Sequence, residues 1–137
     1  MRLDLLMMTI AGLLILPAGA QGQGAGNDCA NASSQMEMNQ CAAKQLSAAD
    51  AELNMIYKEL VHKLDSAGQG YVRDAQRAWV TFRDKECIAR AGGPQDQGGS
   101  IWPMVVAMCR TELTKDRIVQ LERQRKCPGG DLSCPDQ

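Results

Sequence analysis

Cysteine is the residue type in this chain whose number and spacing point most directly to chemistry. All the cysteines follow an N-terminal segment with the features of a cleavable secretion signal, so we expect the chain to mature where disulfides persist. An even count in a small exported chain favours a disulfide framework, although sequence alone permits many pairings. Pairing nearest neighbours closes only modest loops and predicts these bridges: Cys29 with Cys41, Cys87 with Cys109, and Cys127 with Cys134.

Metal binding and catalysis are the alternatives to that framework. No Cys-x-x-Cys occurs, and His62 is the only histidine, so a zinc site lacks its usual cluster of ligands. His62 falls on an expected helix, where a partly exposed structural role is more common than catalysis. If the cysteines are bonded, no thiolate remains as a nucleophile. We therefore expect no metal and no cofactor.

Carboxylates are plentiful, and glycoside hydrolysis needs only two of them held across a cleft. Asp84 and Glu86 point to different faces of a helix, whereas Glu52 and Glu59 lie among residues expected to face solvent. A narrow helical bundle also offers little concavity for a substrate. An enzyme acting on cell-wall glycans is therefore the least favoured function, and we expect no enzyme.

Two pairs of polar residues are spaced so that their side chains can meet on one helix face. Asp50 and Asn54 are four residues apart, and their expected role is helix capping or an interhelical hydrogen bond. Trp79 and Arg83 have the same spacing, so the guanidinium can lie against the indole while it bonds a neighbouring helix. Arg117 is expected to reach the polar layer of Asp50 or Asp84.

The N-terminal elements frame this chemistry. Residues 1–20 read as a signal peptide, because Arg2 precedes an apolar stretch and small residues frame a cleavage site after Ala20. The apolar stretch is too short for a comfortable membrane span and ends at Pro17, so a stable membrane anchor is not expected. Residues 21–28 are rich in glycine and glutamine and predict a flexible lead-in.

Three helices are expected in residues 29–126. The first begins with a capping box at Ser34 and Glu37, is open to a kink near Ser47, and ends at Gly68 and Gly70. Its apolar positions recur at helical spacing: Met38, Ala42, Leu46, Ala49, Leu53, Ile56, Tyr57, Leu60 and Leu64. The second runs from about Tyr71 to Gly92, with its stripe at Val72, Ala75, Trp79, Phe82 and Cys87.

A dense run of glycines with Pro94 predicts an exposed, mobile loop over residues 92–99. Ser100 is expected to cap the third helix, in which Pro103 falls within the first turn and Lys126 is the last residue. Residues 127–137 predict a tail clipped by a disulfide. The apolar stripe of the third helix is expected at Trp102, Val105, Val106, Cys109, Leu113 and Leu121.

These elements predict an all-α fold, namely a disulfide-braced antiparallel three-helix bundle, since no segment alternates with the period of a half-buried strand. Arg2 and Asp4 leave with the signal peptide, so the formal net charge stays at −1. A nucleic-acid-binding protein normally carries a basic excess, so nucleic acid is not an expected partner.

Four sequence segments together resemble the LprI-type family of secreted lysozyme-inhibitor N-terminal domains, over most of residues 29–125. They are Met38-Asn39-Gln40-Cys41, the run from Ala49 to Tyr57, the run from Ala75 through Gln76 and Trp79 to Cys87, and Gly98-Gly99-Ser100 with Cys109, Thr114, Arg117 and Leu121. The resemblance implies an exported helical domain with the first four cysteines paired as above. The chain departs from the family's lipoprotein form, because it lacks a lipidation cysteine after its signal and adds Cys127 and Cys134.

For the namesake of the family, the resemblance implies inhibition of lysozyme, and it makes lysozyme or another envelope protein the expected partner. We therefore expect a periplasmic or secreted binding protein that covers a lysozyme cleft. The contact residues expected in and beside the loop are Gln95, Asp96 and Gln97, with Trp102 as an aromatic anchor. A plain connector remains the alternative for the loop, and core packing for Trp102. The alternative function is an envelope interaction, assembly or immunity protein without a lysozyme target.

Overall fold

The computed structural model describes residues 29 and 31–127, and every regular element in that part of the chain is helical. The order is α1 (Gln35–Lys63), α2 (Ser66–Arg90), α3 (Gln95–Gly98), the short 3₁₀ turn η1 (Gly99–Ile101) and α4 (Trp102–Lys126). The all-α expectation is confirmed. The predicted signal peptide, the lead-in, and Cys134 with the rest of the tail after Cys127 lie outside the described residues.

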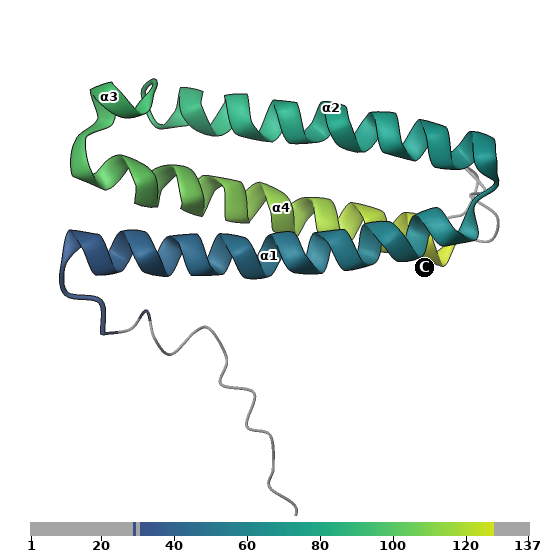
Figure 1. Ribbon diagram of the computed structural model, residues 1–137, viewed down its shortest axis with the longest axis horizontal. Helices are drawn as coiled ribbons and strands as arrows, with labels where there is room; N and C mark the ends of the chain where they lie inside the picture. Colours follow the sequence, from purple (N-terminus) through teal and green to yellow (C-terminus); the bar gives the residue numbers. More distant parts are fainter. Residues whose placement is uncertain (1–28, 30, 128–137) are drawn as a thin grey trace, which may run out of the picture.

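The long helices run side by side, and each reverses the direction of the one before it (Figure 1). In this view α4 lies between α1 and α2, and the contact between α1 and α4 is the most extensive in the fold. α2 rests mainly on α4 and touches α1 much less. The arrangement therefore consists of a tightly packed helix pair with a third helix laid along it.

α1 begins at the capping box that the sequence predicts. The Glu37 backbone N–H donates to Ser34 Oγ over 3.2 Å, and the Ser34 N–H donates to Glu37 Oε2 over 2.9 Å. Together they satisfy backbone donors that the first turn leaves unpaired. The helix continues through Ser47 without interruption to Lys63.

The expected boundary between the first two helices is wrong. α1 ends before Leu64, and α2 starts at Ser66, so Gly68 and Gly70 lie inside α2 rather than after α1. The cause is Asp65, whose side chain accepts from the Gly68 N–H over 2.8 Å and caps the new helix. One good N-cap outweighs the modest cost of glycine within a helix.

The expected start of the third helix is also wrong. α4 begins at Trp102 after Ile101, with no side-chain cap, and Ser100 lies in the preceding 3₁₀ turn. Pro103 does fall within the first turn of α4, where its missing N–H costs little. The glycine-rich segment that was expected to be mobile contains α3 and the start of η1.

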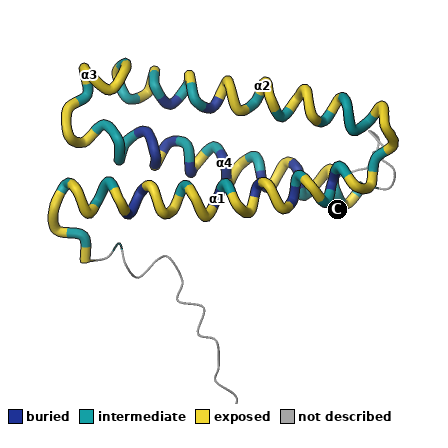
Figure 2. Tube along the Cα trace, in the orientation of Figure 1, coloured by how far each residue is buried: buried dark blue, intermediate teal, exposed yellow. Residues whose placement is uncertain are grey.

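The core follows the contact between α1 and α4, and Figure 2 shows buried positions gathered along these two helices. One buried cluster unites Leu53, Ile56, Leu60, Ile118 and Leu121. A second unites Cys87, Val106 and Cys109. α2 buries only Arg83 and Cys87, and two residues of its expected apolar stripe, Ala75 and Phe82, are exposed. Within the described residues, no helix combines the length and the apolar character that a membrane span requires.

Candidate functional site

Both described disulfides lie toward the same end of the helices. Cys29 pairs with Cys41 at the start of α1, with Cα atoms 5.5 Å apart, and Cys87 of α2 pairs with Cys109 of α4, at 5.6 Å. These are ordinary Cα separations for a disulfide, and both predicted pairs are confirmed. The third predicted pair involves Cys134, outside the described residues. We call the part of the molecule that contains residues 29, 31–50 and 83–110 the disulfide end.

The connection from α2 to α4, residues 91–101, crosses the disulfide end and is held in a defined shape. Gly92, Gly93 and Gly99 adopt positive φ angles of 82°, 126° and 62°, which side chains of L-residues rarely allow. The Gly93 N–H donates to the carbonyl of Ile88 over 3.0 Å, and the Gln97 N–H donates to that of Pro94 over 3.0 Å. We call residues 91–101 the α2–α4 loop.

Trp102 fastens this loop to the start of α4. Its indole Nε1 donates to the carbonyl oxygen of Gly93 over 2.8 Å, and its ring packs on the cluster around Cys87 and Cys109. A Cβ added at Gly98 would lie 2.1 Å from Trp102 Cδ1, so the ring occupies the space that any other residue at position 98 would need. Trp102 is therefore partly buried and packs against both the loop and this cluster, and its role as an aromatic contact for a partner stays a prediction.

The loop exposes polar side chains on α3, flanked by the exposed apolar residues Pro94 and Ile101. Gln95, Asp96 and Gln97 are all exposed on α3. The loop is also fastened to α1, because Asn39 Nδ2 donates to the carbonyl of Ser100 over 3.0 Å. The structure thus brings the predicted polar contact residues together on an ordered projection.

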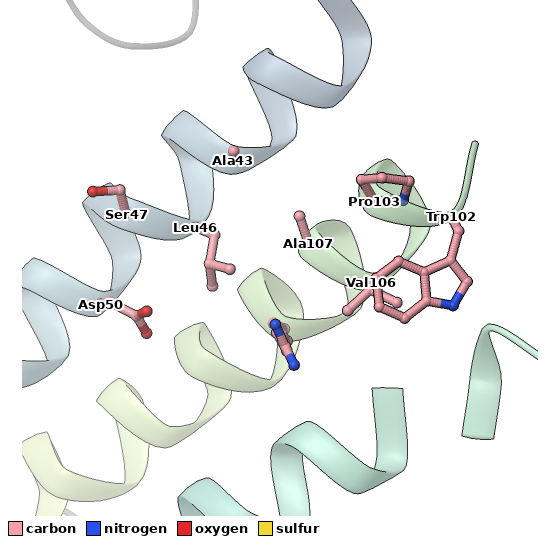
Figure 3. A pocket seen from close by; sticks show the side chains of 9 residues that line it. Ala43, Leu46, Ser47, Asp50, Trp102, Pro103, Val106 and Ala107 are labelled. Carbon is pink, nitrogen blue, oxygen red and sulfur yellow. The ribbon is translucent and has the colours of Figure 1, made fainter. Parts of the chain in front are cut away.

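A groove lies between α1 and the first turns of α4, next to the loop. It has a volume of about 440 Å³ and is open to one side, and its lining is Ala43, Leu46, Ser47, Asp50, Trp102, Pro103, Val106, Ala107 and Arg110. Figure 3 shows Leu46 directed from α1 toward α4, with Val106 and the indole of Trp102 across from it. We call this the α1–α4 groove.

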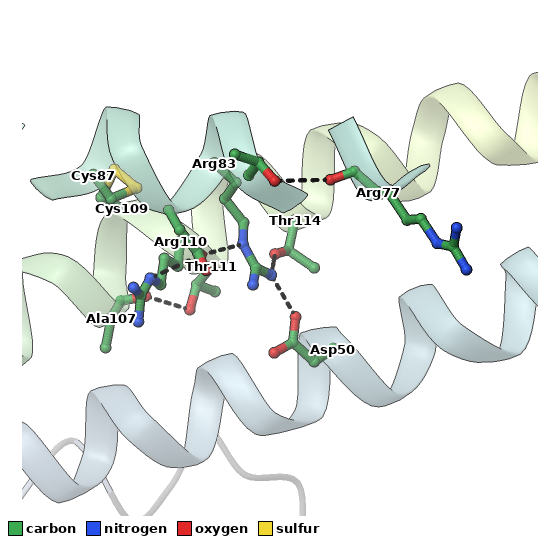
Figure 4. A network of polar contacts seen from close by, with 11 residues as sticks. Asp50, Arg77, Arg83, Cys87, Ala107, Cys109, Arg110, Thr111 and Thr114 are labelled. Atoms are coloured by element: carbon green, nitrogen blue, oxygen red, sulfur yellow. Dashed lines mark hydrogen bonds and ion pairs between the residues drawn. A yellow bond between two sulfur atoms is a disulfide. The ribbon is translucent and has the colours of Figure 1, made fainter. Parts of the chain in front are cut away.

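A layer of paired charges crosses the helices beside the groove (Figure 4). Arg83 Nη1 donates to Asp50 Oδ1 over 2.7 Å and to Thr114 Oγ1 over 3.0 Å, so one guanidinium joins α2 to both other long helices. Asp84 Oδ1 accepts from Arg83 Nε over 3.2 Å and lies 3.1 Å from Arg110 Nε. Two arginines and two aspartates form this layer, and their formal charges cancel.

Most of the remaining residues singled out from the sequence lie near Trp79 or the core. The guanidinium carbon of Arg83 lies 5.3 Å from the Trp79 ring centroid, and that of Arg117 lies 5.9 Å away. The expectation that Arg117 reaches Asp50 or Asp84 is wrong. It donates instead to Gln76 Oε1 over 3.1 Å, and its burial lowers its pKa. Asn54 is exposed, and Tyr57 packs partly buried against the core.

Sequence reasoning missed three participants at the disulfide end. Arg110 was not singled out, although Val106, Arg110 and Thr114 repeat at helical spacing along the face of α4 that meets Arg83. Leu46 was assigned to the core stripe but also lines the groove. Gly98 was counted among the breakers, whereas its role is to admit Trp102.

Among residues 29 and 31–127 no group of three or more histidine, cysteine, aspartate or glutamate side chains is placed to hold a metal ion. His62 is exposed on α1, far along the chain from the loop. The recognisable features are an ordered loop, a groove and a neutral charge layer, which suit a binding surface.

Residues 26–121 match the family described as Lysozyme inhibitor LprI. The chain belongs to the LprI family. The predicted membership is confirmed, and the matched region contains the loop, the groove and the charge layer of this LprI chain. It is also similar to an uncharacterized protein of Rhizobium meliloti (strain 1021), with 38% identity over 123 residues that cover 80% of this chain and 87% of the relative. No solved structure matches the chain.

Proposed function

We propose that this LprI protein is an exported lysozyme inhibitor that binds across the enzyme's cleft with its disulfide end. The observation that carries the proposal is the coincidence of family and geometry. The family is one of lysozyme inhibitors, and the match includes the loop that the Cys87–Cys109 disulfide encloses and that Trp102 fastens at Gly93.

A rigid projection suits inhibition because ordering a flexible loop on binding consumes interaction free energy. Here the loop is already restrained by its own backbone hydrogen bonds, by the Trp102 bond and by Asn39. A standard inhibitor interface buries roughly 800 Å² on each partner. The loop and the neighbouring ends of α1 and α4 supply the contact area.

The exposed amides of the loop fit the chemistry of the target. Glycosidases carry two carboxyl groups on either side of the scissile bond. The side-chain amides of Gln95 and Gln97 offer N–H donors to such acceptors, and a lysozyme carboxylate bonded in this way is withdrawn from its substrate. The inhibitor itself performs no catalysis.

The rest of the chain serves export and bracing in this proposal. Residues 1–20 direct export to the periplasm or the medium and are removed, residues 21–28 lead into the domain, and residues 29–126 form one antiparallel three-helix bundle. The tail from Cys127 is clipped to Cys134. The mature protein then diffuses to its target.

The test is a cell-wall lysis assay with chicken-type, goose-type and invertebrate-type lysozymes, with and without the oxidised mature protein. We expect dose-dependent protection against at least one class. The double variant Gln95→Ala/Gln97→Ala should weaken inhibition about tenfold, as expected for the loss of two hydrogen bonds of roughly 0.5–1.5 kcal/mol each. Gln124→Ala, which removes an exposed amide near the far end of α4, is the matched control and should inhibit like the wild type.

Absence of protection by a large excess of wild-type protein against all three classes would contradict the proposal. Another envelope partner would then have to be sought. If the wild type inhibits lysozyme and the loop variant inhibits no worse than the Gln124 control, the protein is still an inhibitor but the loop is not part of its interface.

A further inference from the structure

The α1–α4 groove is a concave feature of the disulfide end, and the family match assigns it no role. It begins where the loop ends, because Trp102 both anchors the loop at Gly93 and forms part of the groove lining. A partner that covers the loop therefore meets the groove as well. Its volume of about 440 Å³ lies within the range of roughly 300–1,000 Å³ that small ligands occupy.

The side chains that line the groove indicate which class of chemical group it would bind. Six of the lining residues carry apolar side chains on two facing helices: Ala43, Leu46, Trp102, Pro103, Val106 and Ala107. The single polar group of Trp102, its indole N–H, is already bonded to Gly93, so the ring offers only its apolar surface. Figure 3 shows that apolar side chains from both helices face the space between them. Such walls favour a hydrophobic ring over a group with many hydroxyls.

The polar residues of the lining determine which chemical group at the end of that ring would fit the groove. Ser47, Asp50 and Arg110 are the polar members of the lining. Asp50 is paired with Arg83, and Arg110 with Asp84, so the charges of this layer cancel before anything binds. An ionised group brought here would be desolvated without a free counter-charge. A neutral hydroxyl can instead donate to a carboxylate or accept from a guanidinium.

We propose that the α1–α4 groove receives one tyrosine side chain from the bound lysozyme, with the ring between Leu46 and Trp102 and the phenolic hydroxyl at Ser47, Asp50 and Arg110. The inference rests on the proposed function and adds a second point of attachment to it. The loop covers the cleft, and the groove holds an aromatic residue from the cleft rim. Buried aromatic residues in such pockets commonly dominate the affinity of an interface.

Filling the groove tests this directly. Ala43 is exposed on α1 and lines the groove, so Ala43→Phe places a ring where the tyrosine should enter. Ala48 is also an exposed alanine of α1 but is absent from the lining, so Ala48→Phe is the matched control. We expect the inhibition constant to rise at least tenfold for Ala43→Phe and less than twofold for Ala48→Phe, with unchanged melting temperatures.

The occupant is identified from the enzyme. In the lysozyme that the wild type inhibits, each exposed tyrosine at the cleft rim is replaced by alanine. One such change should weaken inhibition at least tenfold, and it should add little when the inhibitor carries Ala43→Phe, because both changes remove the same contact. Absence of any sensitive tyrosine would overturn the proposal.

Three other results would also overturn it. If Ala43→Phe inhibits like the wild type while the Gln95→Ala/Gln97→Ala variant does not, the proposed function stands and the groove has no part in it. If tri-N-acetylchitotriose changes the tryptophan fluorescence of the free wild-type protein and Ala43→Phe abolishes this change, the groove binds glycan instead. If the wild type inhibits no lysozyme, this inference fails together with the function on which it rests.

Discussion

Arg83 and Asp50 meet across the bundle, with Nη1 of the first 2.7 Å from Oδ1 of the second, although 33 positions separate them in the chain. The Arg83 side chain is only 10% exposed, whereas that of Asp50 is 38% exposed. The buried residues of α2 are only Arg83 and Cys87. We therefore expect this bond and the Cys87–Cys109 disulfide to contribute strongly to the attachment of α2 to the other helices.

Replacing Arg83 by alanine should therefore destabilise the protein strongly. The change leaves Asp50, Asp84 and Thr114 without their shared donor, and we expect a loss of roughly 2–4 kcal/mol in the free energy of unfolding, measured by urea denaturation. Arg77→Ala is the control, because Arg77 lies on the same helix but forms an ion pair with Asp74 in which the side chains are 75% and 79% exposed. The control should change stability by less than about 0.5 kcal/mol. Similar losses for the two variants would refute the structural role of the layer.

Two glycine-to-alanine changes should have opposite signs. At Gly98 a Cβ would lie 2.1 Å from Trp102, so Gly98→Ala must displace the ring or the loop and should cost about 1–3 kcal/mol. At Gly70, inside α2, a Cβ meets nothing within 4 Å, so Gly70→Ala should stabilise the helix by roughly 0.5–1 kcal/mol. Thermal unfolding of both variants decides the matter, and a neutral Gly98→Ala would show that Trp102 does not fix the loop.

The buried disulfide should matter more than the one at the start of α1. Removing the Cys87 and Cys109 bridge as a double alanine variant frees a loop with a sequence separation of 22 and disturbs a cluster in which Cys87 is 0% exposed. We expect a loss of about 3–4 kcal/mol, including the loop-closure term of roughly 3 kcal/mol. The corresponding Cys29→Ala/Cys41→Ala variant should lose less, because its separation is 12 and it joins only the start of the described chain. Denaturation under oxidising conditions compares the two, and the reverse order would contradict this reading of the core.

The capping box predicts a pH dependence. Hydrogen bonds from the backbone of Ser33 and then of Ser34 lower the pKa of Glu37 from 4.5 to about 2. The folded state thus binds this proton more weakly than the unfolded state, so the stabilisation is fully present above pH 4.5 and is lost as the pH falls toward 2. The stability difference between the wild type and Glu37→Gln, followed by circular dichroism, should shrink across that window. A difference that stays constant with pH would argue against a charged Glu37 in the cap.

Local sequence patterns predicted much of the fold. The capping box at Ser34, the two described cysteine pairs and the all-helical class all depend on residues close in sequence or on chain reversal at a glycine-rich segment. The helix boundary near Gly68 was missed because an N-cap at Asp65 competes with glycine as a helix terminator, and the outcome depends on both local costs. The stripe of α2 was misread at Phe82, which is 54% exposed, because helical periodicity does not say how closely a neighbouring helix approaches.

The candidate site was less accessible from sequence. Trp79 and Arg83 share a helix face by spacing, but the partner of Arg83 on α1 and the pairing of Asp84 with Arg110 depend on how three helices are rotated about their axes. The same holds for Arg117, which contacts Gln76 rather than either aspartate. The burial of Trp102 beneath Gly98 requires the path of the loop, and neighbouring residue types do not specify that path.

The bridge from Cys87 to Cys109 encloses the whole α2–α4 loop, with every peptide bond from residue 88 to residue 108 inside the ring that it closes. Exposed loops are preferred sites of proteolytic cleavage. A protease that cuts beside Gln95 or Gln97 therefore produces no free fragment, because both new ends stay tied through the buried sulfur atoms. A chain that is cut once within this loop therefore remains a single covalent molecule.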